Sequence, residues 1–254
     1  MDPATLIGVL LALVIVVIAN MMEGGDPTAL ILIPPMLLVF GVTLLISMAG
    51  GTIADTKGAF KGLKRAFTAP AAGPADLIPE IVSLAEKARR EGLLSLEDAL
   101  QTVEDPFLAR ALTLAIDGTD PEELREILEA EIDAQANDDK QAAKFWTAAG
   151  GYAPTIGIVG TVMGLVHVLE SLANPEELGH LIAGAFVATL WGVLSANVIF
   201  LPVAARLKRL AELEVHRMEL IVEGVAAVQA GSNPRIVAQR LSSRLPAEQR
   251  PEAA

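Results

Sequence analysis

Two threonine hydroxyls lie inside long apolar stretches of this sequence. Thr161 belongs to the run APTIGIVGTVMGLVHVLESL at residues 153–172, and Thr189 belongs to AFVATLWGVLSANVIFLP at residues 185–202. In such surroundings a hydroxyl can simply donate to the carbonyl four residues earlier in its own helix. It can equally provide a ligand for a dehydrated ion on a path through the molecule. Thr161 and Thr189 are therefore candidate ion-path residues.

Small residues recur around both threonines at helical spacing. Residues at i, i+4, i+7 and i+11 share one face of a helix. Two such faces combine small residues with one hydroxyl each: Gly157, Thr161, Gly164 and Val168, and Ala185, Thr189, Gly192 and Ala196. Faces of this kind let helix backbones approach closely in lipid. They favour ordinary helix packing or the docking of a partner helix, through Gly157, Gly160, Gly164, Ala185, Gly192 and Ala196.

The elements that carry these residues are predicted to span a membrane. Of the 254 residues, 52% are hydrophobic, which is too many for a water-soluble core of this size. Four windows of 20 to 28 residues lack Lys, Arg, Asp and Glu, and about 20 apolar residues suffice for a spanning helix. The runs do not alternate, which excludes barrel strands. We predict an all-α membrane protein with four transmembrane helices, at residues 3–22, 28–50, 152–172 and 181–205.

The first window reads as a retained span. It has no basic residue before it and no small-residue cleavage site before Glu23, both of which a secretory signal peptide would carry. The remaining segments are then a helical cytoplasmic domain at residues 51–148 and a cytoplasmic tail at residues 206–254.

Basic residues indicate the orientation. Of the 19 Lys and Arg, 11 fall between Lys57 and Lys144 and 8 from Arg206 onward, whereas the two short loops between spans have none. Lys and Arg accumulate on the cytoplasmic side of spanning helices. Both termini and the central domain are therefore expected in the cytoplasm, in a multi-pass protein of the plasma (inner) membrane.

Breaker and capping residues divide the central segment into helices. The Ala- and Pro-rich residues 69–73 separate it from the second span. Apolar residues repeat with a period of 3.6 over residues 76–90, and Gly92 ends this helix. Ser95 is expected to cap the next helix.

Two further helix starts follow in the central segment. Pro106 opens a helix at residues 107–117. Asp120, followed by Pro and two Glu, is expected to cap a long helix that has no breaker before Gly150 and Gly151.

Composition argues against several other classes of function. The net charge is −12, and residues 55–144 hold 19 acidic and 11 basic residues, the wrong sign for binding nucleic acid. The chain has no Cys, only three His and no phosphate-binding loop. No nucleophile–base or metal-ligand pattern occurs, so we expect no enzyme, no metal and no cofactor.

One absence points to a second polypeptide. Ion-coupled membrane proteins generally hold an ionisable carboxylate within the membrane. None of the 31 Asp and Glu lies deep in a predicted span. If the chain conducts ions, another chain must supply the titrating group, with its helix docked on the small-residue faces.

The apolar segments resemble the MotA family of flagellar stator proteins, in the group that includes ExbB and TolQ. The resemblance rests on residues 153–172, on LGHLIAGAFVATLWGVLSANVIFLPVAARLK at 178–208 and on KARREGLLSLE at 87–97. It implies five copies around two MotB-like partners, each with one membrane helix, an ion-binding aspartate and a peptidoglycan-binding domain. Ion flow through this complex would drive rotation against the rotor protein FliG.

The family also suggests roles for four residues. Pro154 and Pro202 match prolines that couple ion flow to conformation, since a missing N–H can hinge a helix. The alternatives are a helix start at Pro154 and a passive kink at Pro202. Arg89 and Glu97 match charged residues that engage the rotor, and their alternative is a solvated helix surface.

The sequence is compatible with more than one transported ion and more than one class of function. The resemblance implies that sodium-type members of the family carry a Thr-Thr pair in the fourth span. This chain has Ala188 and Thr189 at that place. One hydroxyl fewer favours protons over sodium. The other functions considered are an ExbB- or TolQ-like energiser of envelope transport, for which three spans and an outside N-terminus are expected, and a passive membrane scaffold.

Overall fold

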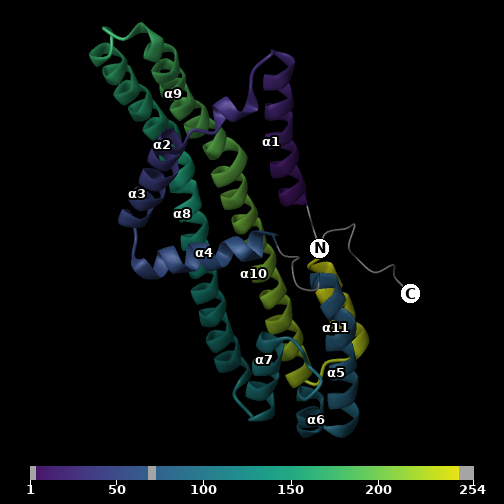
Figure 1. Ribbon diagram of the computed structural model, residues 1–254. Helices are drawn as coiled ribbons and strands as arrows, with labels where there is room; N and C mark the ends of the chain where they lie inside the picture. The colour runs from purple at the N-terminus through teal and green to yellow at the C-terminus, as the bar shows by residue number, and fades with distance from the viewer. Residues whose placement is uncertain (1–3, 68–72, 246–254) are drawn as a thin grey trace. The chain divides into compact units, whose positions relative to one another are not determined.

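The computed structural model describes residues 4–67 and 73–245, and within these ranges the chain forms helices and connecting turns without a strand. They divide into two compact units: unit 1 combines residues 1–69 and 138–209, and unit 2 combines residues 70–137 and 210–254. Two long helices, α8 (Pro121–Glu170) and α10 (Leu201–Gln229), contribute to both units (Figure 1). The predicted all-α class is confirmed.

Unit 1 holds the apolar helices. Helix α1 (Ala4–Met22) is followed by a composite segment, which comprises the 3₁₀ turn η1 (Pro27–Leu30), α2 (Ile33–Met36), the π-helix η2 (Leu37–Val42) and α3 (Thr43–Ala49). The later apolar helices are the second part of α8, and α9 (Pro175–Leu194) continuing through the π-helix η5 (Ser195–Phe200) into α10. Four helices among the described residues are long and apolar enough to cross a membrane.

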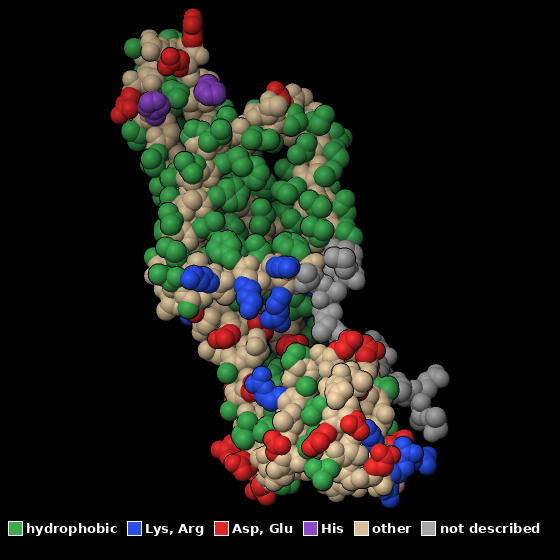
Figure 2. All heavy atoms as spheres, turned by 60° about the horizontal axis from the view of Figure 1, so that its bottom comes forward, with side chains coloured by type: hydrophobic (Ala, Val, Ile, Leu, Met, Phe, Trp, Pro, Cys, Tyr) green, Lys and Arg blue, Asp and Glu red, His purple; other side chains and the backbone are tan. Residues whose placement is uncertain are grey.

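The surface of unit 1 has the pattern that a bilayer requires. Large apolar side chains of α1, α8 and α9 are exposed, and Figure 2 shows them as a continuous apolar band. Lys and Arg side chains gather at one end of this band, and histidine and acidic side chains gather at the other (Figure 2). Such a band is stable next to lipid rather than water, because every large exposed side chain in it is apolar.

An aromatic cluster ties α4 (Ile53–Phe67) to α8. Trp146 packs edge-on against Phe60 and Phe145, with ring centroids 5.4 and 5.2 Å away. Its Nε1 donates a hydrogen bond to the carbonyl oxygen of Ala59 at 3.1 Å. The indole is therefore buried with its one polar atom satisfied, as a tryptophan in a core requires.

The same aromatic chain continues to the second and fourth apolar segments. Phe200 stacks on Trp146 and meets Phe40 edge-on at 6.1 Å. Phe40 in turn contacts Trp191, whose Nε1 donates to the carbonyl oxygen of Leu30 at 2.6 Å. That carbonyl lies where η1 ends, so Trp191 satisfies a backbone acceptor that the break in the helix would otherwise leave unpaired in an apolar environment.

Helix α8 does not end where the sequence predicts. The expectation that Gly150 and Gly151 break the helix is wrong, since α8 runs without interruption from Pro121 to Glu170. A Cβ at Gly150 would lie 2.6 Å from the Leu201 side chain. This glycine therefore permits close packing of α8 on α10 instead of ending the helix.

Unit 2 is a small helical domain around one apolar core. It contains η3 (Pro74–Asp76), α5 (Leu77–Glu91), α7 (Pro106–Ile116), α11 (Pro234–Ser243), the start of α8 and the end of α10. Its fully buried core side chains include Ile81, Leu108, Leu112, Leu124, Leu128, Ile221 and Leu241. The helix predicted at residues 76–90 corresponds to α5, and Asp120 accepts from the Glu122 backbone N–H at 2.9 Å as predicted for a cap.

Ser95 does not cap a helix as expected. It lies inside the 3₁₀ turn η4 (Leu93–Leu96), and its Oγ donates back to the carbonyl oxygen of Gly92 at 2.7 Å. Leu96 is fully buried and precedes the single-turn helix α6 (Glu97–Leu100). The residue in the cap position of α6 is Leu96, and no side chain caps this helix.

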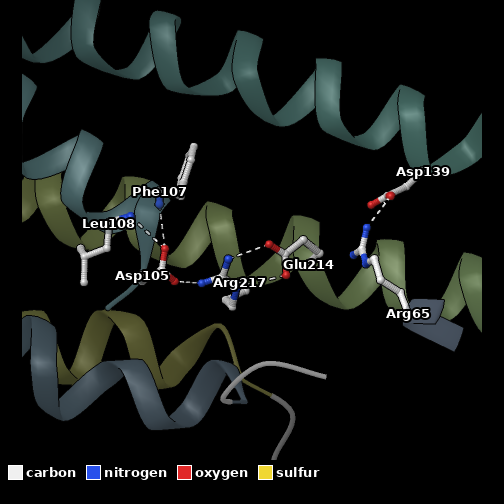
Figure 3. A network of polar contacts seen from close by, with 7 residues as sticks. All are labelled: Arg65, Asp105, Phe107, Leu108, Asp139, Glu214 and Arg217. Carbon is white, nitrogen blue, oxygen red and sulfur yellow. Dashed lines mark hydrogen bonds and ion pairs between the residues drawn. The ribbon is translucent and has the colours of Figure 1, made fainter. Parts of the chain in front are cut away.

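A partly buried arginine stabilises the start of α7. Arg217 on α10 pairs with Asp105 and with Glu214, the latter at 2.6 Å (Figure 3). Asp105 also accepts from the backbone N–H groups of Phe107 and Leu108 at 2.9 and 3.0 Å. Burial lowers the pKa of Arg217, yet an arginine stays charged. In unit 1, a separate pair joins Arg65 on α4 to Asp139 on α8 at 2.6 Å (Figure 3).

A second polar cluster in unit 2 centres on Glu223 of α10. This side chain is only 9% exposed and pairs with Arg125 of α8 at 3.4 Å. It also pairs with Arg240 of α11 at 3.0 Å and with Arg244, just beyond α11, at 3.2 Å. One buried carboxylate thus joins three segments of unit 2. Its removal would leave three neighbouring arginines without this shared counter-charge.

We expect Glu223→Ala to destabilise unit 2 by about 3 kcal/mol, the usual loss when one partner of a buried ion pair is removed. Amide hydrogen exchange in α11 should rise strongly, as measured by mass spectrometry of the full chain in detergent. The control is Glu219→Ala, one turn earlier on α10, where the carboxylate is 49% exposed and lies 3.8 Å from His216. Equal protection of α11 in both variants would contradict a central role for Glu223.

Candidate functional site

The two candidate ion-path threonines meet at the contact between α8 and α9. The hydroxyls of Thr161 and Thr189 are in direct hydrogen-bond contact. Thr161 also lies 2.9 Å from the Ala185 carbonyl oxygen and 3.2 Å from that of Gly157, and Thr189 lies 3.3 Å from the Gly157 oxygen. Four oxygens from two helices therefore cluster within a part of the molecule that is otherwise apolar.

This arrangement goes beyond local bonding within one helix. Thr161 does reach the carbonyl of its own helix four residues earlier, as the simpler interpretation requires. However, its shorter contact crosses to Ala185 on α9, and Thr189 reaches across to Gly157 on α8. Each hydroxyl has one proton and can donate to one acceptor at a time. The contacts therefore offer alternative hydrogen-bond patterns over the same four oxygens.

The two glycines at the centre of the contact allow the helix backbones to touch. A Cβ at Gly192 would lie 2.7 Å from the Ala153 carbonyl oxygen and 2.9 Å from the Gly157 Cα. A Cβ at Gly157 would lie 2.9 Å from the Ala188 carbonyl oxygen. These neighbours are backbone atoms, which cannot rotate away as a side chain can. Glycine is required on both sides.

The remaining small residues extend the same contact. A Cβ at Gly164 would lie 2.6 Å from the Ala185 Cβ, and one at Gly160 would lie 2.7 Å from the Ala188 Cβ. Ala196, on η5, is buried in the core of unit 1 beside Ala153 and Phe200. The small-residue faces of α8 and α9 thus pack against each other within the chain. Docking of a partner helix on these residues stays a prediction.

Three of the six small residues also border an open groove. Gly160, Gly164 and Ala185 line a cavity of about 830 Å³ that α2, η2, α8 and α9 surround. Its remaining lining is mostly aliphatic, with two prolines from α2 and one histidine each from α8 and α9. The groove reaches the small-residue contact from the side, next to the threonine pair.

Both candidate hinge prolines lie within continuous helical stretches. Pro154 is inside α8, so the alternative that it merely starts a helix is wrong. Pro202 is the second residue of α10, directly after the π-helix η5. A proline leaves the carbonyl four residues earlier without its usual donor, and a π-helical turn is a common way to accommodate such a defect. Pro202 also lines a second cavity, between α1 and the η5–α10 junction.

The two π-helices could not be predicted from residue patterns. Both η2 and η5 lie in apolar runs, and each is six residues long. The aromatic contact between Phe40 of η2 and Phe200 of η5 joins them. Because π-helical turns are often functional, their pairing next to Pro202 marks this level of unit 1 as a second region of interest.

The candidate rotor residues lie on unit 2. Arg89 is on the last turn of α5 and Glu97 is the first residue of α6, and both side chains are exposed. Between them, Gly92 adopts φ +87°, which turns the chain sharply after α5. Neither residue has an ion-pair partner within the described part of the chain. Both charges are thus available to solvent or to another molecule.

The described residues contain no group of three or more His, Asp or Glu that could hold a metal ion. The polar groups at and beside the α8–α9 contact are hydroxyl and carbonyl oxygens and the two histidines of the groove.

Comparisons with known proteins place this geometry in context. Residues 99–220 match the model of the "MotA/TolQ/ExbB proton channel family". The chain is 36% identical to Motility protein A of Bacillus subtilis (strain 168), over 98% of this chain and 93% of the relative. Among solved structures, it matches a chain of C. jejuni MotAB over the full length of both chains, with a TM-score of 0.93 and 30% identity. The flagellar MotAB stator complex from Bacillus subtilis matches with a TM-score of 0.89 and 35% identity, over 97% of this chain and 98% of that one.

We expect Gly192→Ala to disrupt the α8–α9 contact, because its Cβ would overlap backbone atoms of α8. Overpacking of this kind typically costs about 1–3 kcal/mol, and the melting temperature in detergent should fall accordingly. Gly151→Ala is the matched control, since a Cβ there meets nothing within 4 Å. A melting temperature unchanged by Gly192→Ala would contradict the close backbone contact.

Proposed function

Because this chain belongs to the MotA family of flagellar stator proteins, we propose that it surrounds a MotB-like partner in several copies and conducts protons with it. As a family member it is an ion-channel subunit of the flagellar stator, in a family of channel subunits rather than enzymes. The observation that carries the proposal is the cluster of Thr161 and Thr189 hydroxyls with two backbone carbonyls in the apolar unit.

A partner is needed for the chemistry to be complete. Hydroxyl and carbonyl oxygens can hydrogen-bond a hydrated proton, but they do not bind one at neutral pH as a carboxylate does. None of the Asp and Glu side chains lies deep in one of the four predicted spans. We propose that a MotB-like subunit places an aspartate near the threonine pair, and that its helix lies against the small-residue helices α8 and α9.

The geometry around position 188 favours protons over sodium. Ala188 is 1% exposed and packs where Gly160 faces it. The second hydroxyl of a Thr-Thr pair is therefore missing at a tightly packed position, and the cluster has two side-chain oxygens instead of three. A dehydrated metal cation is held by several oxygens at once, whereas a proton needs only a continuous set of hydrogen-bonding groups.

The charge distribution supports the proposed orientation. The basic side chains at one end of the apolar band belong on the cytoplasmic side of the inner membrane. In this orientation residues 51–148 and the tail from residue 206 are cytoplasmic, and unit 2 is exposed to the rotor. The loop between α1 and η1 and the turn between α8 and α9 then face outward.

Coupling to rotation is assigned to the prolines and to unit 2. Pro154 lies one turn before the Gly157 carbonyl of the oxygen cluster, and Pro202 follows the π-helix η5. Each removes a backbone hydrogen bond, so a change of charge at the cluster can bend its helix at small cost. Arg89 and Glu97 would then contact the rotor protein, for which FliG is proposed.

We expect Thr189→Val to reduce proton flux about tenfold or more, since a hydrogen bond to a charged group is worth about 1.5–3 kcal/mol. Flux is measured with a pH-sensitive dye in cells that express the chain together with its MotB-like partner. Thr155→Val is the control, because Thr155 is exposed on α8 and bonds only to the Tyr152 carbonyl at 2.7 Å. Undiminished flux in Thr189→Val would rule out an ion-path role for the pair.

We expect Glu97→Lys to stop or strongly slow swimming while leaving proton flux intact, because the charge acts on the rotor and not on the channel. A compensating charge reversal on the rotor protein should restore speed, as measured by tethered-cell rotation. Glu122→Lys, an exposed exchange in the first turn of α8, serves as the control. If cells that carry Glu97→Lys and cells that carry Arg89→Glu both swim normally, these residues belong only to a solvated surface.

A further inference from the structure

The groove between α2, η2, α8 and α9 has two ionisable residues in its lining, His167 and His180. They come from different helices, His167 from the last turn of α8 and His180 from the second turn of α9. The composite segment opposite them, residues 27–49, contains no ionisable side chain. Two imidazoles thus face an otherwise apolar cavity of about 830 Å³.

The histidines lie at the far end of the helices that carry the threonine pair. His167 is six residues beyond Thr161, and His180 is nine residues before Thr189. At 1.5 Å per residue these separations correspond to about 9 and 14 Å along the helix axes. The groove also reaches Gly160, Gly164 and Ala185, which pack beside the threonines. It therefore extends from the imidazoles to the small residues that lie beside the threonine pair.

The charges around the histidines are all acidic. Glu170 on α8 lies 3.4 Å from the Nδ1 of His167, and both side chains are exposed. The first turn of α9 carries Glu176 and Glu177. Figure 2 shows histidine and acidic side chains together at this end of the apolar band. The loop between the first two spans adds Glu23 and Asp26.

No basic residue competes with the imidazoles. Residues 1–56 and 145–205 contain no Lys or Arg. The histidines are consequently the side chains of this end that can become cationic. A surface of one charge sign raises the local concentration of counter-ions, and histidine is the side chain that ordinarily changes its charge between pH 5 and 8.

We propose that His167 and His180 form a protonatable gate that takes up protons from outside and passes them along the groove toward the threonine pair. Each imidazole gains one proton and one positive charge on uptake. It loses both when the proton moves to water in the groove or to the carboxylate of the partner, so the imidazole returns unchanged. Such a gate selects protons, because an imidazole nitrogen that binds a proton does not hold sodium.

This inference rests on the proposed function and assigns the uptake step of the same path. The test uses the full chain with its MotB-like partner and measures proton flux at external pH values from 5.5 to 8.5. The variant is His167→Gln with His180→Gln, since glutamine keeps a polar side chain of similar size but does not take up a proton in this range. We expect flux at pH 7 to fall about fivefold or more and its dependence on external pH to flatten, because the two imidazoles that take up external protons are gone.

The matched control is His216→Gln on α10, which changes the remaining histidine of the chain and lies in unit 2. Its pH profile should equal that of the unaltered chain. If the double variant does not reach the membrane, as followed with a fluorescent tag, the profile is measured for each single variant. A pH profile and flux equal to those of the unaltered chain, in the double variant or in both single variants, overturn the gate.

The failure of the gate can be told apart from a failure of the proposed function. If the unaltered chain and its partner carry no proton flux at any pH, the proposed proton conduction is refuted. If they carry flux and the histidine variants carry the same flux with the same pH dependence, the channel stands and the gate alone falls.

Discussion

The backbone contact between α8 and α9 is the constraint on which the rest of unit 1 depends. Gly157 and Gly192 bring the two helices so close that a Cβ on either would overlap backbone atoms of the other. In lipid there is little hydrophobic gain from packing one apolar helix on another, so close contact and interhelical hydrogen bonds hold the pair. The same closeness lets the hydroxyls of Thr161 and Thr189 meet. Packing and polar chemistry are therefore two results of one contact.

The chain divides its charges in a way that fits this contact. Its spans carry hydroxyls and carbonyls but no deep carboxylate, so the oxygen cluster is neutral and stable in an apolar environment without a counter-charge. Ion pairs instead lie outside the predicted spans. Arg65 pairs with Asp139 in unit 1, and in unit 2 Arg217 pairs with Asp105 and Glu223 with Arg240. Beside a neutral oxygen cluster, a partner's single carboxylate would be the one group at that level of the path whose charge changes.

Much of this organisation could be predicted from the sequence, because it follows from local rules. Charge-free windows mark apolar helices by length alone, and Asp120 followed by proline is a local capping signal. The predictions fail where contacts with residues distant in the sequence determine the local structure. Gly150 does not end α8, because Leu201 packs against it. Periodicity predicted the small faces of both helices, but only tertiary structure shows that they meet each other. The π-helices η2 and η5 likewise depend on packing between segments, and no residue pattern announces them.

The two tryptophans have a consequence for spectroscopy. Trp146 and Trp191 are the only tryptophans of the chain, and both belong to unit 1, where each indole donates a hydrogen bond to a backbone carbonyl. Unit 2 has none, so intrinsic indole emission is a label-free reporter of unit 1 alone. Since Trp191 and Trp146 are linked through Phe40 and Phe200, a helix that bends at Pro202 would alter the surroundings of both fluorophores. Emission shifts would then follow the working cycle of the channel in real time.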